Sequence, residues 1–451
     1  MSKVIKIKKG LDIKLVGTAE KILKKAEQAD TYAVKPTDFQ GIRPKLLVKT
    51  GDRVKAGAPL FFDKFQPEVK FTSPVSGEVI EINRGERRMI LEVVVKADPE
   101  IEYESFDVPD TKSLTREEII AILQQSGLWP AIRQRPYSII ARANDIPKAI
   151  FISAFDSAPL APDIDYIAKE YGDEFQQGID ILSKLTDGKI HLSLNADYPP
   201  ADTYTKVKGV EFHYFKGPHP AGNVGVQINK IDPINKGEVV WYTYPQEIIM
   251  IGRLFNKGIY DASKIIALTG SEVIHPKYYK IISGACIANL VKDNVTEDKP
   301  LRYISGNVLT GSKIYSQGYV GYYDNMITVI PEGDYYEMFG WAKPGFNKFS
   351  ASRAVLSWLI PGRKFKLDTN LHGGPRAYVM TGEYEKVFPM DIYPVQLIKA
   401  IMIEDIDLME KLGIYEVDEE DFALCEYVCT SKTEVQSIIR EGLDLMRKEM
   451  S

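Results

Sequence analysis

The sequence predicts a multidomain α/β and α+β protein. The prediction rests on a length of 451 residues, a change of hydrophobic pattern along the chain, and helical spacing near its C-terminal end. A chain of this length exceeds one ordinary domain, so we expect several units, each with its own core. Composition and pattern place the boundaries at 1–110, 111–257, 258–312, 313–380 and 381–451.

Composition excludes several classes of partner. Hydrophobic residues make up 44% and charged residues 26%, which is typical of water-soluble globular proteins. The net charge is −5 and the basic residues are dispersed, so we expect no nucleic acid partner. No apolar run is long enough to span a bilayer, so membrane contact should come only through partners. Three cysteines and the lack of a signal-peptide pattern predict a cytoplasmic protein.

Short β-strands are predicted in the first unit, because apolar or β-branched runs alternate with turn residues at 46–48, 59–62, 78–82 and 89–95. Residues 48–57 and 72–79 resemble the two halves of a biotinyl/lipoyl carrier domain. Lys64 lies between these halves, where a carrier presents its modified lysine. Its spacing to Pro74 is longer than in carriers and Pro67 intervenes, so we expect an unmodified barrel of this type.

Strands and helices alternate from residue 111, which predicts an α/β layer with a mostly parallel sheet. Thr115 can cap a helix, and residues 148–154 have the apolar run of a buried parallel strand. A helix at 175–185, a strand at 209–215 and a helix at 245–256 follow. Beyond them we expect a small α+β module that ends near residue 311. C-terminal helices are predicted at 394–402, 405–412, 419–428 and 433–446.

The segment 126–136 carries Trp129, Arg133, Arg135 and two prolines. In the flavin-binding subunits of the Rnf complex and of complex I, a glycine-rich loop stands at the similar place, and its N–H groups hold the flavin phosphate. Bulky side chains would fill that space, and proline donates no N–H. Phe155 and Asp156 replace a second flavin contact only approximately. The sequence therefore predicts a degenerate flavin loop and no cofactor bound by this chain.

Other polar motifs favour structural interpretations. The glycine- and proline-rich segment 217–225 can be an anion loop with His219 titrating near neutrality, or a rigid connection between two strands, which we favour. The five histidines lack metal-ligand spacing, so no metal site is predicted. Cys425 and Cys429 are expected to be two small buried side chains. Arg84, Arg87 and Arg88 can dock an acidic partner or lipid headgroups, although a solvated turn is the default expectation.

Many motifs, taken in order, resemble one family over essentially the whole chain: the A subunit of the sodium-translocating NADH:quinone reductase. The motifs are Asp38-Phe39-Gln40-Gly41-Ile42-Arg43-Pro44, Phe71-Thr72-Ser73-Pro74-Val75-Ser76-Gly77, Gly217-Pro218-His219-Pro220-Ala221-Gly222, Ile304-Ser305-Gly306-Asn307, Phe339-Gly340-Trp341 and Pro389-Met390-Asp391-Ile392. One departure is Cys429-Thr430-Ser431-Lys432, where the family usually has Cys-Pro-Gly-Lys.

The resemblance implies a biotinyl-like barrel, a Rossmann-like layer, a β-grasp (soluble-ligand-binding) module and a C-terminal helical domain. It also implies a place at the cytoplasmic face of the bacterial inner membrane, held peripherally by the membrane-embedded B subunit and the other subunits. The assembly is a translocase that oxidises NADH, reduces ubiquinone and exports sodium. NADH, FAD and the iron–sulfur centre belong to other subunits, and no catalytic residue is identified in this chain.

Three roles remain open. The chain can be a docking scaffold, a participant in quinone reduction, or a flavoprotein of the Rnf type. For the second role, a quinone site is predicted at the degenerate flavin loop, where aromatic rings can stack the quinone and an arginine can stabilise negative charge on its oxygen. Its predicted residues are Trp129, Arg133, Arg135, Phe155 and Asp156, with Asp38, Phe39 and Arg43 approaching from the first domain.

Overall fold

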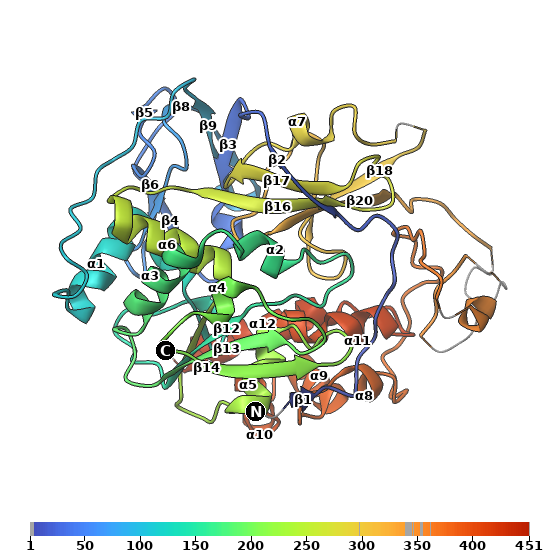
Figure 1. Ribbon diagram of the computed structural model, residues 1–451. Helices are drawn as coiled ribbons and strands as arrows, with labels where there is room; N and C mark the ends of the chain where they lie inside the picture. Colours follow the sequence, from blue (N-terminus) through green and yellow to red (C-terminus); the bar gives the residue numbers. More distant parts are fainter. Residues whose placement is uncertain are drawn as a thin grey trace.

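The computed structural model describes residues 4–296, 298–338, 345, 347–351, 355–360 and 362–450, so the Phe339-Gly340-Trp341 motif lies outside the described residues. The described strands form four sheets, of seven, six, four and three strands. In Figure 1 the two small sheets lie at the upper left and the six-stranded sheet crosses the upper half. The seven-stranded sheet and the C-terminal helices fill the lower half.

The first unit packs two small antiparallel sheets around one core. The four-stranded sheet has the order β3 (Thr31–Val34), β9 (Ile90–Ala97), β8 (Gly77–Arg84) and β5 (Arg53–Val54), and the three-stranded sheet has the order β4 (Pro44–Leu46), β6 (Pro59–Asp63) and β7 (Lys70–Thr72). Phe61 and Phe71 stack in the core with ring centroids 4.7 Å apart. The predicted strands are confirmed, although the one expected at 46–48 lies earlier, as β4. Lys64 is exposed in the β6–β7 connection.

The seven-stranded sheet has a parallel centre and an antiparallel edge. Its order is β1 (Val4–Lys6), β14 (Glu211–Lys216), β13 (Lys189–Asn195), β12 (Ala149–Ser153), β15 (Val240–Thr243), β10 (Arg133–Arg135) and β11 (Ile139–Ile140). The first five run parallel, whereas β10 runs antiparallel to β15 and β11. The prediction that 148–154 contains a buried parallel strand is confirmed, because every residue of β12 is buried.

Helices cover both faces of this sheet. Ile150 and Ile152 of β12 belong to the core that includes α3 (Gly172–Leu182) and α6 (Pro245–Lys257). Phe151 points the other way, toward α5 (Val224–Ile231). The predicted start of α1 (Arg116–Ser126) is also confirmed, because Thr115 and Glu118 form a reciprocal capping box. Shorter helical elements in this part are η1 (Pro36–Asp38), η2 (Glu86–Arg88), η3 (Trp129–Ala131), α2 (Ile164–Ala168) and α4 (Asp202–Thr205).

The six-stranded sheet receives one strand from near the N-terminus. Its order is β19 (Ser312–Ile314), β18 (Leu301–Ser305), β20 (Met326–Pro331), β16 (Ser263–Thr269), β17 (Lys277–Ile282) and β2 (Glu20–Lys25). The short helix α7 (Ala288–Val291) follows β17. This sheet therefore extends beyond the predicted 258–312 module in both directions.

An N-terminal strap, residues 4–25, ties three bodies together (Figure 1). It begins as β1 beside β14 and ends as β2 beside β17. Between these strands the N–H of Gly10 donates to the carbonyl of Lys386 in the C-terminal region at 3.1 Å. Because its two ends belong to different sheets, the strap fixes where the chain enters the first unit, after β2, relative to both sheets.

The C-terminal region is helical, as predicted. Its elements are η4 (Leu356–Leu359), α8 (Tyr384–Val387), α9 (Pro394–Met402), α10 (Ile406–Lys411), η5 (Ile414–Glu416), η6 (Glu419–Phe422), α11 (Ala423–Val428) and α12 (Val435–Glu449). The single helix predicted at 419–428 is corrected to a 3-10 turn followed by α11, because a capping box between Asp418 and Asp421 closes the first turn tightly. Cys425 and Cys429 are buried, as expected.

Glycine sets the distance between α3 and α6. A Cβ at Gly252 would lie 1.8 Å from the carbonyl oxygen of Glu174 on the facing helix. Gly252→Ala should therefore force the helices apart and destabilise the fold by about 1–3 kcal/mol, as overpacking does. The loss should appear as a lower midpoint of thermal unfolding. Gly374→Ala is the matched control, since a Cβ there meets nothing within 4 Å. Equal midpoints for both variants would contradict the prediction.

Candidate functional site

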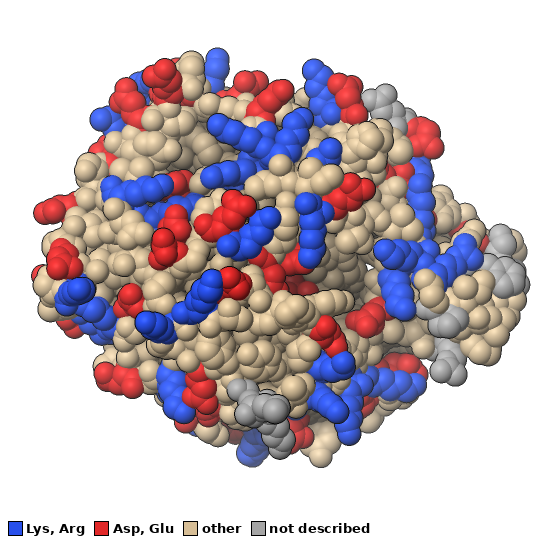
Figure 2. Space-filling model, viewed as in Figure 1, with Lys and Arg blue, Asp and Glu red and all other residues tan. Residues whose placement is uncertain are grey.

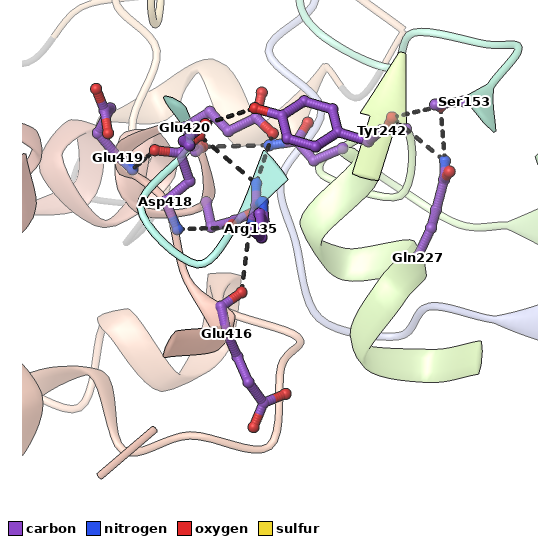
Figure 3. A network of polar contacts seen from close by, with 12 residues as sticks. Arg135, Ser153, Gln227, Tyr242, Glu416, Asp418, Glu419 and Glu420 are labelled. Carbon is purple, nitrogen blue, oxygen red and sulfur yellow. Dashed lines mark hydrogen bonds and ion pairs between the residues drawn. The ribbon is translucent and has the colours of Figure 1, made fainter. Parts of the chain in front are cut away.

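The seven-stranded sheet contains a switch point between β12 and β15. From β12 the chain proceeds outward through β13 and β14, and then returns to place β15 on the opposite side of β12. In open α/β sheets, ligands bind outside the carboxyl ends of the strands at such a point. Ser153 ends β12 here, and its hydroxyl donates to the carbonyl of Gly222 (2.9 Å) and accepts from Gln227 of α5 (2.8 Å, Figure 3). These bonds tie the carboxyl end of β12 to the start of α5.

A buried arginine joins this sheet to the C-terminal helices (Figure 3). Arg135 of β10 is completely buried. Its guanidinium donates to Asp421 at 2.7 Å, to Glu420 at 3.0 Å and to the carbonyl oxygen of Glu416 at 3.0 Å. Asp418 Oδ2 is a fourth neighbour, 3.6 Å from Arg135 Nη2. Since a buried cation must be compensated, this arginine is committed to the 416–421 turn and offers nothing to an external ligand.

The same turn packs against the N-terminus of α5. Asn223, the residue before α5, donates through Nδ2 to the carbonyl of Glu420 at 3.2 Å. A Cβ at Gly225 would lie 2.3 Å from Arg135 Nη1 and 2.5 Å from Asp421 Oδ2, so only glycine fits beside that ion pair. A helix N-terminus at a switch point is the usual position for a nucleotide phosphate. Here a carboxylate of the chain itself lies against that position.

The degenerate loop is filled by its own side chains. Trp129 is fully buried, stands edge-on to Trp241 with ring centroids 5.5 Å apart, and donates through Nε1 to the carbonyl of Ala141 at 2.8 Å. The indole is therefore part of the core. Neither this side chain nor that of Arg135 reaches open space, although both were predicted to line a quinone site.

Arg133, in contrast, is only partly buried and lies among three tyrosine rings. Its guanidinium carbon is 4.3 Å from the ring centre of Tyr323, 4.7 Å from that of Tyr242 and 5.5 Å from that of Tyr244. Arginine keeps its charge at any physiological pH and stacks well on aromatic faces. The structure thus holds a permanent cation between the α/β layer and the turn before β20 (Met326–Pro331), which supplies Tyr323.

The first unit reaches this group through one more aromatic contact. Phe39 packs on Tyr322 and Tyr323 with centroid distances of 5.0 and 5.7 Å, and the N–H of Tyr322 donates to Asp38 Oδ2 at 2.8 Å. Beside Asp38, a pocket of about 20 Å³ is lined by Lys35, Phe39, Gly127 and Tyr322, among others. That volume holds about one water molecule.

Arg133 and the tyrosine rings around it form what we call the Arg133 shell. The remaining predicted residues lie apart from this shell. Phe155 is largely buried after β12, and exposed Asp156 accepts the N–H of Ala158 at 2.8 Å. Arg43 is exposed, and its N–H donates to Asp63 at 2.8 Å. The three predicted docking arginines are all exposed around η2; they are Arg84, Arg87 and Arg88.

The 217–225 segment connects β14 to α5, so the expected strand-to-strand connection is corrected. His219 is buried beside Ser157, with Nδ1 3.0 Å from the hydroxyl oxygen. Burial lowers the pKa of His219 to about 4. This lowered pKa disfavours the alternative in which His219 titrates near neutrality.

Sequence reasoning missed several groups in the shell, above all Glu420 and the tyrosines at 242, 244 and 323. Four neighbouring carboxyl groups, from Asp418 to Asp421, share few cations. Burial and the adjacent Asp418 raise the pKa of Glu419 to about 9. Burial and Asp421 likewise raise the pKa of Glu420 to about 8. Both groups consequently hold a proton at neutral pH, where an ordinary glutamate is ionised. The sequence of residues 418–421 does not indicate which arginines these carboxyl groups contact in the fold.

Within the described residues, no helix is both long and apolar enough to cross a membrane. Figure 2 shows Lys and Arg interspersed with Asp and Glu over the face in view, with neither sign covering it. That distribution does not resemble the basic face of a nucleic-acid-binding protein.

Comparison with known families gives three matches in chain order. Residues 5–98 match the NqrA N-terminal barrel-sandwich hybrid domain, residues 114–260 the NqrA second alpha/beta domain, and residues 265–316 the NQRA C-terminal domain. The expected barrel and α/β layer are confirmed at this level. The three matches together span well over half of the chain.

Similar proteins extend the match over nearly the full length. The chain is 40% identical to proteins of Rhodopirellula baltica and Neisseria meningitidis, over 99% of this chain and 98% and 100% of those proteins. It is 37% identical to a protein of Vibrio alginolyticus, over 99% of this chain and 100% of that one. All three are described as the A subunit of Na(+)-translocating NADH-quinone reductase.

Solved structures give a weaker likeness. A chain of an NAD+-reducing nickel–iron hydrogenase in the air-oxidised state covers 77% of this chain and 67% of its own length, with a TM-score of 0.37 and 10% identity. A score this low supports no statement about this chain.

The raised pKa of Glu420 predicts how stability depends on pH. Between its ordinary value of 4.5 and about 8, the folded chain binds a proton that the unfolded chain releases. The contribution of Glu420 to the free energy of unfolding is therefore fully present below about pH 4.5. It falls as the pH rises from there to about 8, by at most about 1.4 kcal/mol per pH unit. Glu420→Gln should flatten this fall, because the amide cannot ionise.

Thermal midpoints measured from pH 5 to 9 test this prediction. Glu441→Gln, an exposed substitution on α12, is the control and should keep the pH slope of the unmodified chain. If Glu420→Gln shows that same slope, Glu420 ionises normally in the folded chain.

Proposed function

The chain belongs to the NqrA family, the A subunit of the Na(+)-translocating NADH-quinone reductase, and from that membership we propose its own part in the enzyme. It acts as a component without redox cofactors, at the place where ubiquinone is reduced to ubiquinol while the complex exports sodium. NADH, FAD and the iron–sulfur centre lie on other subunits. The chain is held peripherally at the cytoplasmic face of the inner membrane by the membrane-embedded B subunit and the remaining subunits.

Two features support the proposed absence of a flavin. Trp129 fills the loop in which flavin-binding relatives use glycines, and Asp421 lies at the N-terminus of α5. A flavin phosphate placed there would meet an ion pair that the chain already forms, because Asp421 is bound to Arg135 at 2.7 Å beside Gly225. The alternative of a flavoprotein of the Rnf type is therefore disfavoured.

The quinone position that the geometry favours is the shell around Arg133. The single observation that carries this proposal is the cation held among the rings of Tyr242, Tyr244 and Tyr323. Rings of this kind can stack a quinone head, and the guanidinium can stabilise negative charge that develops on a quinone oxygen. Phe39, with Asp38 beside it, would form the wall contributed by the first unit.

Reduction of a quinone to a quinol takes up two electrons and two protons. The electrons would come from cofactors on the partner subunits, whereas this chain can supply one proton and water the other. Glu420 is the candidate donor, because its carboxyl holds a proton at neutral pH and is within electrostatic range of Arg133. Arg135 holds that carboxyl in place through a hydrogen bond of 3.0 Å to Glu420 Oε1 (Figure 3).

A pure docking scaffold is the second candidate. The small volume of the pocket beside Asp38, about 20 Å³, favours it, because a quinone head needs more room unless Phe39 and Tyr322 move. In either role we propose that Arg84, Arg87 and Arg88 face an acidic partner surface or lipid headgroups, since all three are exposed at one turn.

We also propose a fold type for each unit of the chain. The switch point between β12 and β15 supports a Rossmann-like second unit. A β-grasp module is proposed around the six-stranded sheet, and a structural copy of the biotinyl/lipoyl barrel at the start, in which Lys64 is unmodified. The domain boundaries proposed are those expected from the sequence, with the N-terminal strap crossing between units.

Arg133→Gln should reduce ubiquinone turnover by the reassembled complex about 10–100-fold, because a charged donor to the developing oxyanion is lost. NADH oxidation with a soluble artificial acceptor should be unchanged. Arg53→Gln, at an exposed ion pair of the first unit, is the control and should leave both activities intact. A photoreactive quinone analogue should label this chain near Arg133. Labels confined to other subunits would exclude the quinone role and leave the scaffold.

The purified chain should be colourless. We expect no absorbance of an oxidised flavin and no NADH oxidation by the chain alone, since the phosphate position is filled. Release of flavin on denaturation, measured by fluorescence, is the more sensitive form of the same test. One mole of flavin per mole of chain would overturn the cofactor-free proposal.

A further inference from the structure

Two histidines that lie far apart in the sequence meet on neighbouring strands. His191 of β13 and His213 of β14 lie on the same face of the seven-stranded sheet, with Nδ1 of His191 2.9 Å from Nε2 of His213. The His191 ring also stacks on Phe151 of β12, with centroids 4.7 Å apart. One imidazole is therefore fixed by packing, while the other lies toward solvent.

A carboxylate completes the cluster. Glu211 is the register partner of His191 on β14, and alternation along that strand directs it to the same face as His213. Ligand atoms of His191, Glu211 and His213 all lie within 4.8 Å of one another, and no other such group of three occurs among the residues that the structure describes. Strands thus supply the arrangement that the spacing in the sequence does not reveal.

All three groups are in the form that binds metal. Burial, together with His213, lowers the pKa of His191 to about 4, and burial lowers the pKa of His213 as well. A hydrogen bond from Lys189 lowers the pKa of Glu211. At neutral pH the two imidazoles are consequently neutral and the carboxyl is ionised, so each offers a lone pair.

We propose that His191, Glu211 and His213 form a binding site for a divalent transition-metal ion of the zinc type. Two nitrogens and one carboxylate oxygen are a common protein ligand set for Zn²⁺. Nitrogens bound to one tetrahedral Zn²⁺ lie about 3.3 Å apart, from Zn–N distances of 2.0–2.1 Å. The two imidazoles therefore need to separate by only a few tenths of an ångström, and the proton now between them moves to the other nitrogen of the ring that carries it.

The surroundings leave the site accessible. Glu211 is exposed and His213 is partly exposed, so a fourth ligand position would be open to water. Lys189, which pairs with Glu211 at 2.7 Å, must release the carboxylate. Such an exposed pair contributes little to stability and is readily exchanged. Ser193 lies two residues after His191 on β13 and is the register partner of His213. Its buried hydroxyl has no hydrogen-bond partner and can hydrogen-bond to a ligand of the ion.

This site lies in the half of the sheet away from the switch point. Glu211 and His191 are near the starts of their strands, whereas Ser153 and Tyr244 mark the carboxyl ends of theirs. An ion there would clamp β13 to β14 without touching the Arg133 shell. The inference is independent of the proposed quinone role.

Titration of the tag-free full chain with Co²⁺ tests the proposal. We expect one ion per chain, visible absorption bands of a low-coordinate Co²⁺ complex, and loss of those bands on addition of Zn²⁺. His213→Gln and Glu211→Gln should each weaken binding by more than about tenfold, since even outer-shell partners of metal ligands contribute 10–100-fold. Zn²⁺ should raise the thermal midpoint of the unmodified chain and not of these variants.

His275→Gln is the control, because His275 is exposed and outside the cluster, and it should bind like the unmodified chain. Circular dichroism establishes that each variant is folded; should His213→Gln fail to fold, Glu211→Gln carries the test, because its side chain is exposed. Binding that is equal in the cluster variants and in the control would overturn the site. So would an unmodified chain that shows neither Co²⁺ bands nor a Zn²⁺-dependent midpoint, which would leave a hydrogen-bonded histidine pair only.

Discussion

The fold depends most on the burial of Arg135. A guanidinium with no exposed surface is tolerated only when carboxylates and carbonyls surround it, and all of them come from the turn at 416–421. Breaking one side of such a buried set typically costs about 3–5 kcal/mol, because the other side is left charged without a partner. The α/β layer and the C-terminal helices are therefore not independent. Each supplies the charge that makes burial of the other acceptable.

This constraint also explains the arrangement of the site. Once the 416–421 turn packs against the switch point, Asp421 lies at the start of α5, and Gly225 is required because a side chain would clash with it. Burial, together with the excess of carboxyls over nearby cations, then raises the pKa values of Glu419 and Glu420 above neutrality. The filled N-terminus of α5 and the buried protons are thus two consequences of the same packing arrangement. The cation that remains accessible is Arg133, two residues away on the same strand and on the same face as Arg135.

Local signals in the sequence predicted local structure well. Thr115 and Glu118 form their capping box within four residues, and the apolar run at β12 could only be a buried strand in an alternating pattern. The substitution of glycines by Trp129 and its neighbours also indicated a filled loop. Where prediction failed, the determinants were distant. Arg135 and Asp421 are 286 residues apart, so nothing in either segment showed that the arginine would be withdrawn from the crevice.

The pairing of His191 with His213 was likewise set by distant parts of the fold. His191 and His213 are 22 residues apart, a spacing with no meaning on one helix or one strand, and they meet because β13 and β14 pair in parallel with a specific register. A shift of one residue would turn one of the rings to the opposite face, where α3 and α6 pack. Register is fixed by the apolar residues between them, such as Leu192 and Leu194, which must face that core. Ligand geometry on the polar side of a strand is thus set by hydrophobic burial on the other, and sequence spacing alone carries no record of it.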